Sequence, residues 1–193
     1  MGHGVLLVIL LWLGCTRTNQ VDVKDPDLVP FDIGRIQSAR FLETQFSNVD
    51  QGRGVAMLLM SDQDVSCDAF KLAFSGNSYY YGLLTGQSSV FQDSSGLVAV
   101  FQWNHDGETN AGWEGDYPVF SYAESEEGAL ERSAWVLPFA DDQTWIAFSG
   151  GFARIDGMNS GIEGEIRTRA LEASFDAEYC GKLTGGYYGD SAR

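Results

Sequence analysis

Strict alternation of apolar and polar residues is the feature that most constrains the fold of this chain. It runs without a fault from Leu171 to Cys180, with one side formed by Leu171, Ala173, Phe175, Ala177 and Tyr179. A period of two residues is typical of an antiparallel strand with one buried face and is incompatible with a helix. Residues Ile162–Ala170 alternate in the opposite phase. A one-residue slip turns every side chain to the other face, so we expect a bulge or turn at Ala170–Leu171.

The rest of the chain consists of short apolar runs between turn residues. Its 23 glycines against four prolines suit the many tight turns of an all-β domain. Phe31–Phe46 fits either a helix or a strand, whereas Ser61–Asp64 resembles a capping box that opens a helix over Gln63–Leu72. Further strands are predicted over Val55–Met60, Tyr79–Leu84, Leu97–Trp103, Tyr117–Tyr122, Ala134–Phe139 and Thr144–Ile155, the last with a bulge at Gly150–Gly151.

These elements predict the fold class. About eight short strands and one short helix suit an all-β domain, either an antiparallel β-sandwich or a flattened barrel. We expect one such domain over residues 31–193, because this length can bury a sizeable core.

Charge limits the classes of partner. The net charge is −15, and no charged residue precedes Arg17. A chain this acidic repels nucleic-acid phosphates and anionic lipid head groups, so nucleic-acid binding is not expected. No lysine or arginine lies between Lys71 and Arg132, while nine acidic residues do. This stretch is either a solvated surface or a site for a cation or a basic partner.

The N-terminus resembles a targeting signal. Val5–Leu13 is apolar throughout and too short to span a bilayer as a helix, which is typical of a signal-peptide core. Leu11-Trp12-Leu13-Gly14-Cys15 resembles the lipobox of bacterial lipoproteins. The resemblance implies a signal over residues 1–14 and an acylated Cys15. The segment after this cysteine is polar and contains two prolines, which predicts a tether over residues 15–30. The resemblance also implies a lipid-anchored location in the cell envelope, at the outer membrane, whereas an ordinary cleaved signal would imply secretion.

Two further cysteines, Cys67 and Cys180, remain in the folded part. An even pair in an exported chain predicts a disulfide bond, and the alternative is two buried thiols. The end of the last strand at Tyr179-Cys180, together with Gly115–Val119, resembles the β-domains of uncharacterised bacterial lipoproteins. In that family a cysteine near a short helix and a cysteine ending the last strand recur as a pair, and no activity is implied.

The residues of known catalytic chemistry are mostly absent from the sequence. Beyond the signal there is a single histidine, His105, and Gly157–Gly161 has the wrong spacing for a nucleophile elbow. Neither a closed zinc site nor a phosphate-binding loop is present. A hydrolase is therefore the third choice of function, and no cofactor is expected except calcium. The candidate oxygen ligands for calcium are Asp106, Glu108 and Asn110, which lie in a polar loop.

Aromatic residues supply the other candidate ligand site. Trp113 lies in the same polar loop, where an indole is hard to bury, and Tyr117 follows it. Exposed together they would suit carbohydrate stacking, and buried they would only fill the core. We therefore expect a non-enzymatic, lipid-anchored extracytoplasmic protein with a structural or protein-interaction role. The alternative is a carbohydrate- or calcium-binding β-domain.

Overall fold

The computed structural model describes residues 18–45, 53–74, 91–104, 113–120, 132–141, 150–158 and 161–184. These ranges form a nine-stranded sheet and one helix, α1 (Cys67–Phe74), which confirms the all-β expectation. The strands are β1 (Gln20–Val23), β2 (Ser38–Gln45), β3 (Arg53–Ser61), β4 (Ser95–Asn104), β5 (Gly115–Pro118), β6 (Arg132–Ala140), β7 (Phe152–Met158), β8 (Ile162–Arg167) and β9 (Leu171–Thr184).

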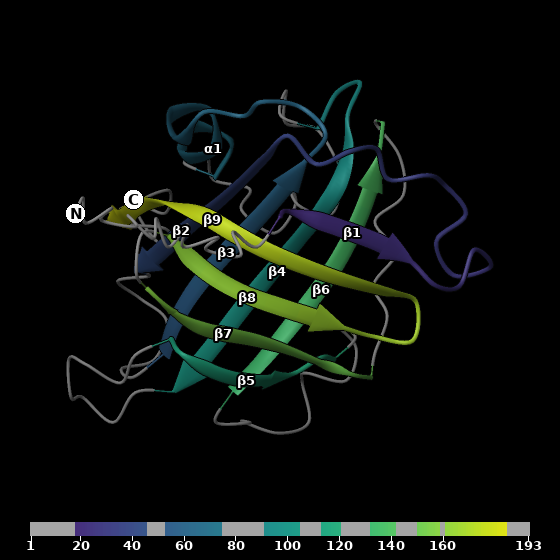
Figure 1. The fold of residues 1–193 in the computed structure, drawn as a ribbon. Coiled ribbons are helices and arrows are strands. Elements are labelled where there is room, and N and C mark those ends of the chain that lie inside the picture. The colour runs from purple at the N-terminus through teal and green to yellow at the C-terminus, as the bar shows by residue number, and fades with distance from the viewer. Residues whose placement is uncertain are drawn as a thin grey trace, which may run out of the picture.

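The sheet curls into a nearly closed, flattened barrel. Eight strands follow the order β5-β7-β8-β9-β2-β3-β4-β6, and β1 pairs with β9 beside this path. The two ends of the path meet where Val119 bridges Ala134 and the Phe120 amide donates to the Ala134 carbonyl. Figure 1 shows a front layer of β1, β9, β8, β7 and β5 crossing over a back layer of β2, β3, β4 and β6.

The sheet is mixed rather than wholly antiparallel, because β2 and β9 are parallel. β9 has 14 residues and is therefore long enough to pair with different strands along its two halves. Its first half pairs with β8 on one side and β1 on the other, and its second half pairs with β2. No local pattern in either strand encodes this contact, which joins residues far apart in the chain.

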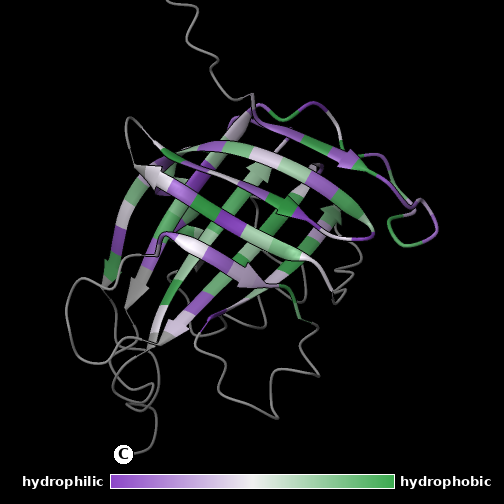
Figure 2. Ribbon diagram, turned by 60° about the horizontal axis from the view of Figure 1, so that its bottom comes forward, coloured by the Kyte–Doolittle hydropathy of each residue, from purple (hydrophilic) through white to green (hydrophobic). Residues whose placement is uncertain are grey.

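A turn separates β8 from β9 at the point where the alternation changes phase. The Thr168 amide donates to the Leu171 carbonyl at 2.9 Å, and the Thr168 hydroxyl accepts the Leu171 amide at 3.0 Å. Ala170 and Leu171 are both buried. The expected turn is therefore confirmed. It brings the buried side chains of β8 and those of β9 onto the same, inner face of the sheet. Figure 2 shows hydrophilic and hydrophobic segments alternating along the strands nearest the viewer.

Two apolar clusters lie on opposite sides of the back layer. The larger cluster fills the barrel and includes Phe41, Leu58, Phe101 and Phe175. The smaller cluster lies on the outer face of the back layer, where Leu42, Met57 and Leu59 pack with Phe70 of α1. Strands β3, β4 and β6 are therefore buried on both faces, which explains their continuous apolar runs.

Residues 20–37 belong to the folded domain. β1 adds an antiparallel strand to β9, and the chain then crosses the end of the barrel toward β2. Along this crossing Val29, Ile33 and Ile36 are buried in the main core. The tether expected over residues 15–30 is thus replaced by structure from residue 20 onward. The physical reason is that these apolar side chains close the barrel end.

Three local predictions need correction or have no outcome. Helix α1 begins at Cys67, and its cap is Ser66, whose hydroxyl accepts the Ala69 amide at 3.2 Å, rather than Ser61. Ser61 instead ends β3 and is fully buried. Gly150 and Gly151 precede β7, whose irregular pairing lies between Ile155 and Gly157. The predicted strand over residues 79–84 lies outside the described residues, as does the first part of the one over 144–155.

Candidate binding surfaces

The outer face of the front layer is exposed and charged, in contrast to the apolar outer face of the back layer. Register places its side chains in rows across the strands. One row carries Asp22, Glu172, Arg167 and Phe152, and the next carries Gln20, Ser174, Glu165, Arg154 and Asp116. A third row carries Asp176 and Glu163. We call this surface the acidic face.

Ion pairs neutralise the two rows nearest the β8–β9 turn. Arg154 donates to both oxygens of Asp116, at 2.6 and 3.2 Å, and this contact holds the Asp116 pKa below its usual value. Arg167 contacts Glu165 at 2.8 Å. Both guanidinium groups also lie over the Phe152 ring, at 5.7 and 5.9 Å from its centre. Charge in these rows is therefore locally balanced.

The third row is not balanced. Glu163 and Asp176 are directly opposite each other on adjacent antiparallel strands. Within the described residues neither carboxylate forms an ion pair, whereas Asp116 and Glu165 in the neighbouring row each pair with an arginine. Like charges at opposed positions destabilise a sheet. The fold thus retains an electrostatic cost at this place on its surface.

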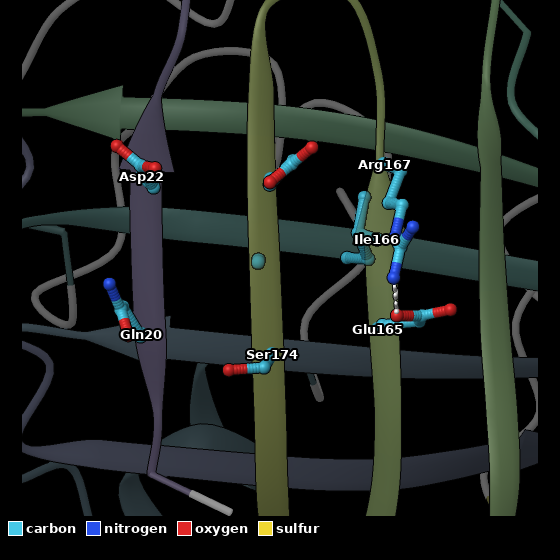
Figure 3. A pocket seen from close by; sticks show the side chains of 8 residues that line it. Gln20, Asp22, Glu165, Ile166, Arg167 and Ser174 are labelled. Carbon is cyan, nitrogen blue, oxygen red and sulfur yellow. Dashed lines mark hydrogen bonds and ion pairs between the residues drawn. The ribbon is translucent and has the colours of Figure 1, made fainter.

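A shallow hollow of about 210 Å³ lies in the acidic face where β1, β9 and β8 run side by side. Figure 3 shows Gln20 and Asp22 on β1 facing Ser174 on β9, with Glu165 and Arg167 beyond. Two of its lining carboxylates, Asp22 and Glu172, contact Lys24 at 2.5 and 3.2 Å. The hollow is polar and open to solvent, so it is a shallow depression in the acidic face and not an enclosed pocket.

The predicted disulfide bond between Cys67 and Cys180 is present, with a Cα–Cα distance of 5.2 Å. It joins the first residue of α1 to the outer face of β9. Cys180 is buried among the apolar residues that α1 covers. The bond is therefore structural, holding the helix against the back of the barrel.

The two aromatic candidates have different environments. Tyr117 is 0% exposed inside the barrel, so it contacts no surface ligand and the expectation for it is corrected. Its hydroxyl donates to the Trp113 carbonyl at 2.5 Å, and Arg132 lies over its ring. Burial raises the pKa of Tyr117 to about 12. The period of two could have predicted this, because β5 has Asp116 and Pro118 outside and Tyr117 inside.

Trp113 is half-buried and packs against the main core. It stacks on Phe41 at 5.1 Å and on Tyr179 at 5.6 Å between ring centres. Tyr179 is 41% exposed, and its hydroxyl donates to Glu43 at 3.3 Å. The sequence did not single out Tyr179 or Glu43, because their proximity depends on the parallel pairing of β2 and β9.

Several predicted site residues lie outside the described residues, namely Cys15, Asp106, Glu108 and Asn110. Within the described ranges, no three histidine, cysteine, aspartate or glutamate side chains gather closely enough to hold a metal ion. In the same ranges, no helix is both long and apolar enough to cross a membrane. Calcium binding and acylation therefore stay predictions.

Comparison with known proteins gives no family for this chain. No protein-family model matches the sequence, and neither a curated protein nor a solved structure matches the chain.

Proposed function

We propose that the protein is a non-catalytic interaction domain that docks a basic protein surface through its acidic face. The observation that carries this proposal is the opposed pair Glu163 and Asp176, which lacks a basic partner among the described residues. Such a pair costs stability in the free protein. A lysine or arginine from a partner would relieve the repulsion between the two carboxylates. The free energy released in this way would contribute to the affinity of the complex.

The contrast between the two outer faces supports the same proposal. α1 and apolar packing cover the back of the barrel, while the front carries carboxylates in ordered rows. A rigid sheet holds these charges at fixed spacing, which favours recognition of a complementary charge pattern. The net charge of −15 adds long-range attraction for a basic partner.

We also propose that this domain is exported and held in the cell envelope by a lipid on Cys15. The lipobox-like Leu11–Cys15 supports this placement. The disulfide bond adds weak support, because such bonds persist mainly in oxidising compartments. A protein that docks others at a membrane surface would combine both features.

Charge-neutralising variants test the docking proposal, with the peptide decalysine as the probe. We expect Glu163→Gln to weaken decalysine binding at low salt while raising the melting temperature, because it removes the repulsion from Asp176. The stabilisation should be roughly 0.2–1 kcal/mol. Glu165→Gln is the control on the same strand and should not raise the melting temperature, because Glu165 is paired with Arg167.

A second control separates local docking from net charge. Asp68 is exposed on α1, away from the acidic face. Asp68→Asn removes one negative charge there and should change decalysine binding less than Glu163→Gln. Equal weakening by the two variants, or no saturable binding by the unaltered protein, would refute the proposed docking surface.

A further inference from the structure

A cluster of three aromatic rings lies where β2 and β9 pair. Phe41 and Tyr179 are register partners on these parallel strands, so their side chains lie next to each other on the inner face. Trp113 stacks on both rings, with interplanar angles of 29° and 28°. One indole therefore covers two neighbouring rings and fixes the orientation of each. We call Phe41, Trp113 and Tyr179 the aromatic cluster.

The aromatic cluster runs from the core to the surface. Phe41 is 0% exposed, Trp113 is half-buried and Tyr179 is 41% exposed. Tyr179 continues the inward phase of β9, yet it reaches solvent because β8 begins at Ile162, opposite Ala177. The sheet thus ends before it covers this ring. An exposed tyrosine that is stacked from within loses little conformational freedom when a ligand binds.

Polar groups surround the exposed ring. The Tyr179 hydroxyl donates to Glu43, and Lys182 contacts the other oxygen of the same carboxylate at 2.9 Å. The ammonium group is substantially exposed. Burial and the nearby Glu43 charge raise the pKa of Tyr179, so its hydroxyl remains protonated at neutral pH. A ligand meets a flat apolar surface edged by a hydroxyl, a carboxylate and an ammonium group.

We propose that Tyr179 and Trp113, with Glu43 and Lys182 at their edge, bind a neutral saccharide of β-linked pyranose rings. Such rings present flat faces of C–H groups that pack on aromatic rings, and hydroxyls around their perimeter. The carboxylate accepts from these hydroxyls and the ammonium donates to them, as orienting polar groups do in small-molecule sites. The net charge of −15 disfavours polyanionic glycans and selects neutral ones.

This site is separate from the acidic face and uses other residues. Saccharide binding therefore goes beyond the proposed docking of a basic protein. The two proposals fail independently, because Glu163→Gln leaves the aromatic cluster intact and substitutions at Tyr179 leave Glu163 and Asp176 unchanged.

Calorimetric titration of the full chain tests the proposal, with cellohexaose and chitohexaose as neutral β-linked probes. We expect saturable binding of at least one of them. Tyr179→Ala should weaken it about tenfold or more, because the stacking surface is lost. Tyr179→Phe retains the ring and should weaken binding much less. Phe152→Ala is the matched control, since it removes a partly exposed aromatic ring from β7 on the acidic face.

Four results would overturn the proposal. These are no binding of either hexasaccharide by the unaltered protein, unchanged affinity in Tyr179→Ala, equal losses in Tyr179→Ala and Phe152→Ala, and stronger binding of polygalacturonate than of the neutral probes. The melting temperature of Tyr179→Ala provides the folding check. If that variant unfolds, Lys182→Ala at the same edge replaces it, and its affinity must fall for the proposal to stand.

Discussion

Cys67 at the start of α1 is bonded to Cys180 on the outward face of β9, on the back of the barrel. The sequence places Cys180 outward, because Phe175, Ala177 and Tyr179 define the inward phase. Helix α1 packs against this outer face, and β9 has one extra residue relative to β2 beside Cys180, between the register pairs Phe41–Tyr179 and Glu43–Lys182.

Removal of this bond should cost much of the stability. The bridged residues are 113 positions apart, so the closed loop restricts the unfolded chain by about 4–5 kcal/mol in the chain-entropy model. We expect the double variant Cys67→Ala/Cys180→Ala to lose free energy of unfolding of this order, measured by urea titration. A loss below about 1 kcal/mol would show that the packing of α1 alone stabilises this region.

Two adjacent glycines should respond differently to alanine. Both have positive φ, but a Cβ on Gly151 would lie 2.1 Å from the Arg167 carbonyl oxygen, whereas a Cβ on Gly150 meets nothing within 4 Å. Gly150→Ala should cost about 1 kcal/mol of unfolding free energy from backbone strain alone. Gly151→Ala should cost clearly more, because the backbones of β7 and β8 must separate. Equal costs in thermal unfolding would contradict this.

Alkaline pH should destabilise the fold through Tyr117. Its folded pKa of about 12 exceeds the ordinary value of 10.0, because the buried ring disfavours the phenolate. The stabilising contribution is therefore complete below pH 10 and is lost as pH rises toward 12, with a size of about 3 kcal/mol. Ultraviolet titration should show one late-ionising tyrosine that is absent in Tyr117→Phe. If Tyr117→Phe lost stability between pH 10 and 12 as steeply as the unaltered protein, this assignment would be contradicted.

Acylation of Cys15 predicts the cellular fraction in which the protein is found. In a bacterial host with the lipoprotein pathway, Cys15→Ser should move the protein from the membrane fraction to the soluble one. The double variant that removes Cys67 and Cys180 retains Cys15 and should stay membrane-bound. Continued membrane association of Cys15→Ser would instead indicate another means of attachment.

Local sequence patterns predicted two kinds of strand: those with one buried face, from alternation, and those with two buried faces, from continuous apolar runs. The alternation in Leu171–Cys180 predicted β9, its phase change predicted the turn before it, and continuous apolar runs predicted β3, β4 and β6. These predictions succeed because burial acts on each strand separately. The disulfide followed from the cysteine count and the expectation that the chain is exported, and required no knowledge of the topology.

Contacts between distant segments were beyond such patterns. β1 lies in a polar stretch with prolines, and its alternation of Gln20, Val21, Asp22 and Val23 is too short to distinguish from a linker. The parallel pairing of β2 with β9 has no local signal, and the aromatic cluster depends on it. The opposed pair Glu163 and Asp176 likewise appears only once the register of β8 and β9 is known.

The attachment of β1 to β9 would limit how far a lipid-anchored domain can stand from a bilayer. The Thr18 carbonyl already accepts a hydrogen bond from Ser174, and the Asn19 side chain accepts one from the Asp176 amide. If Cys15 carries the lipid, three residue steps separate the anchor from this first fixed point, a reach of roughly 10 Å. This is close to the screening length at physiological salt. Such a short connection would hold the barrel at the membrane surface in a restricted set of orientations, which would limit the directions from which a soluble partner can approach.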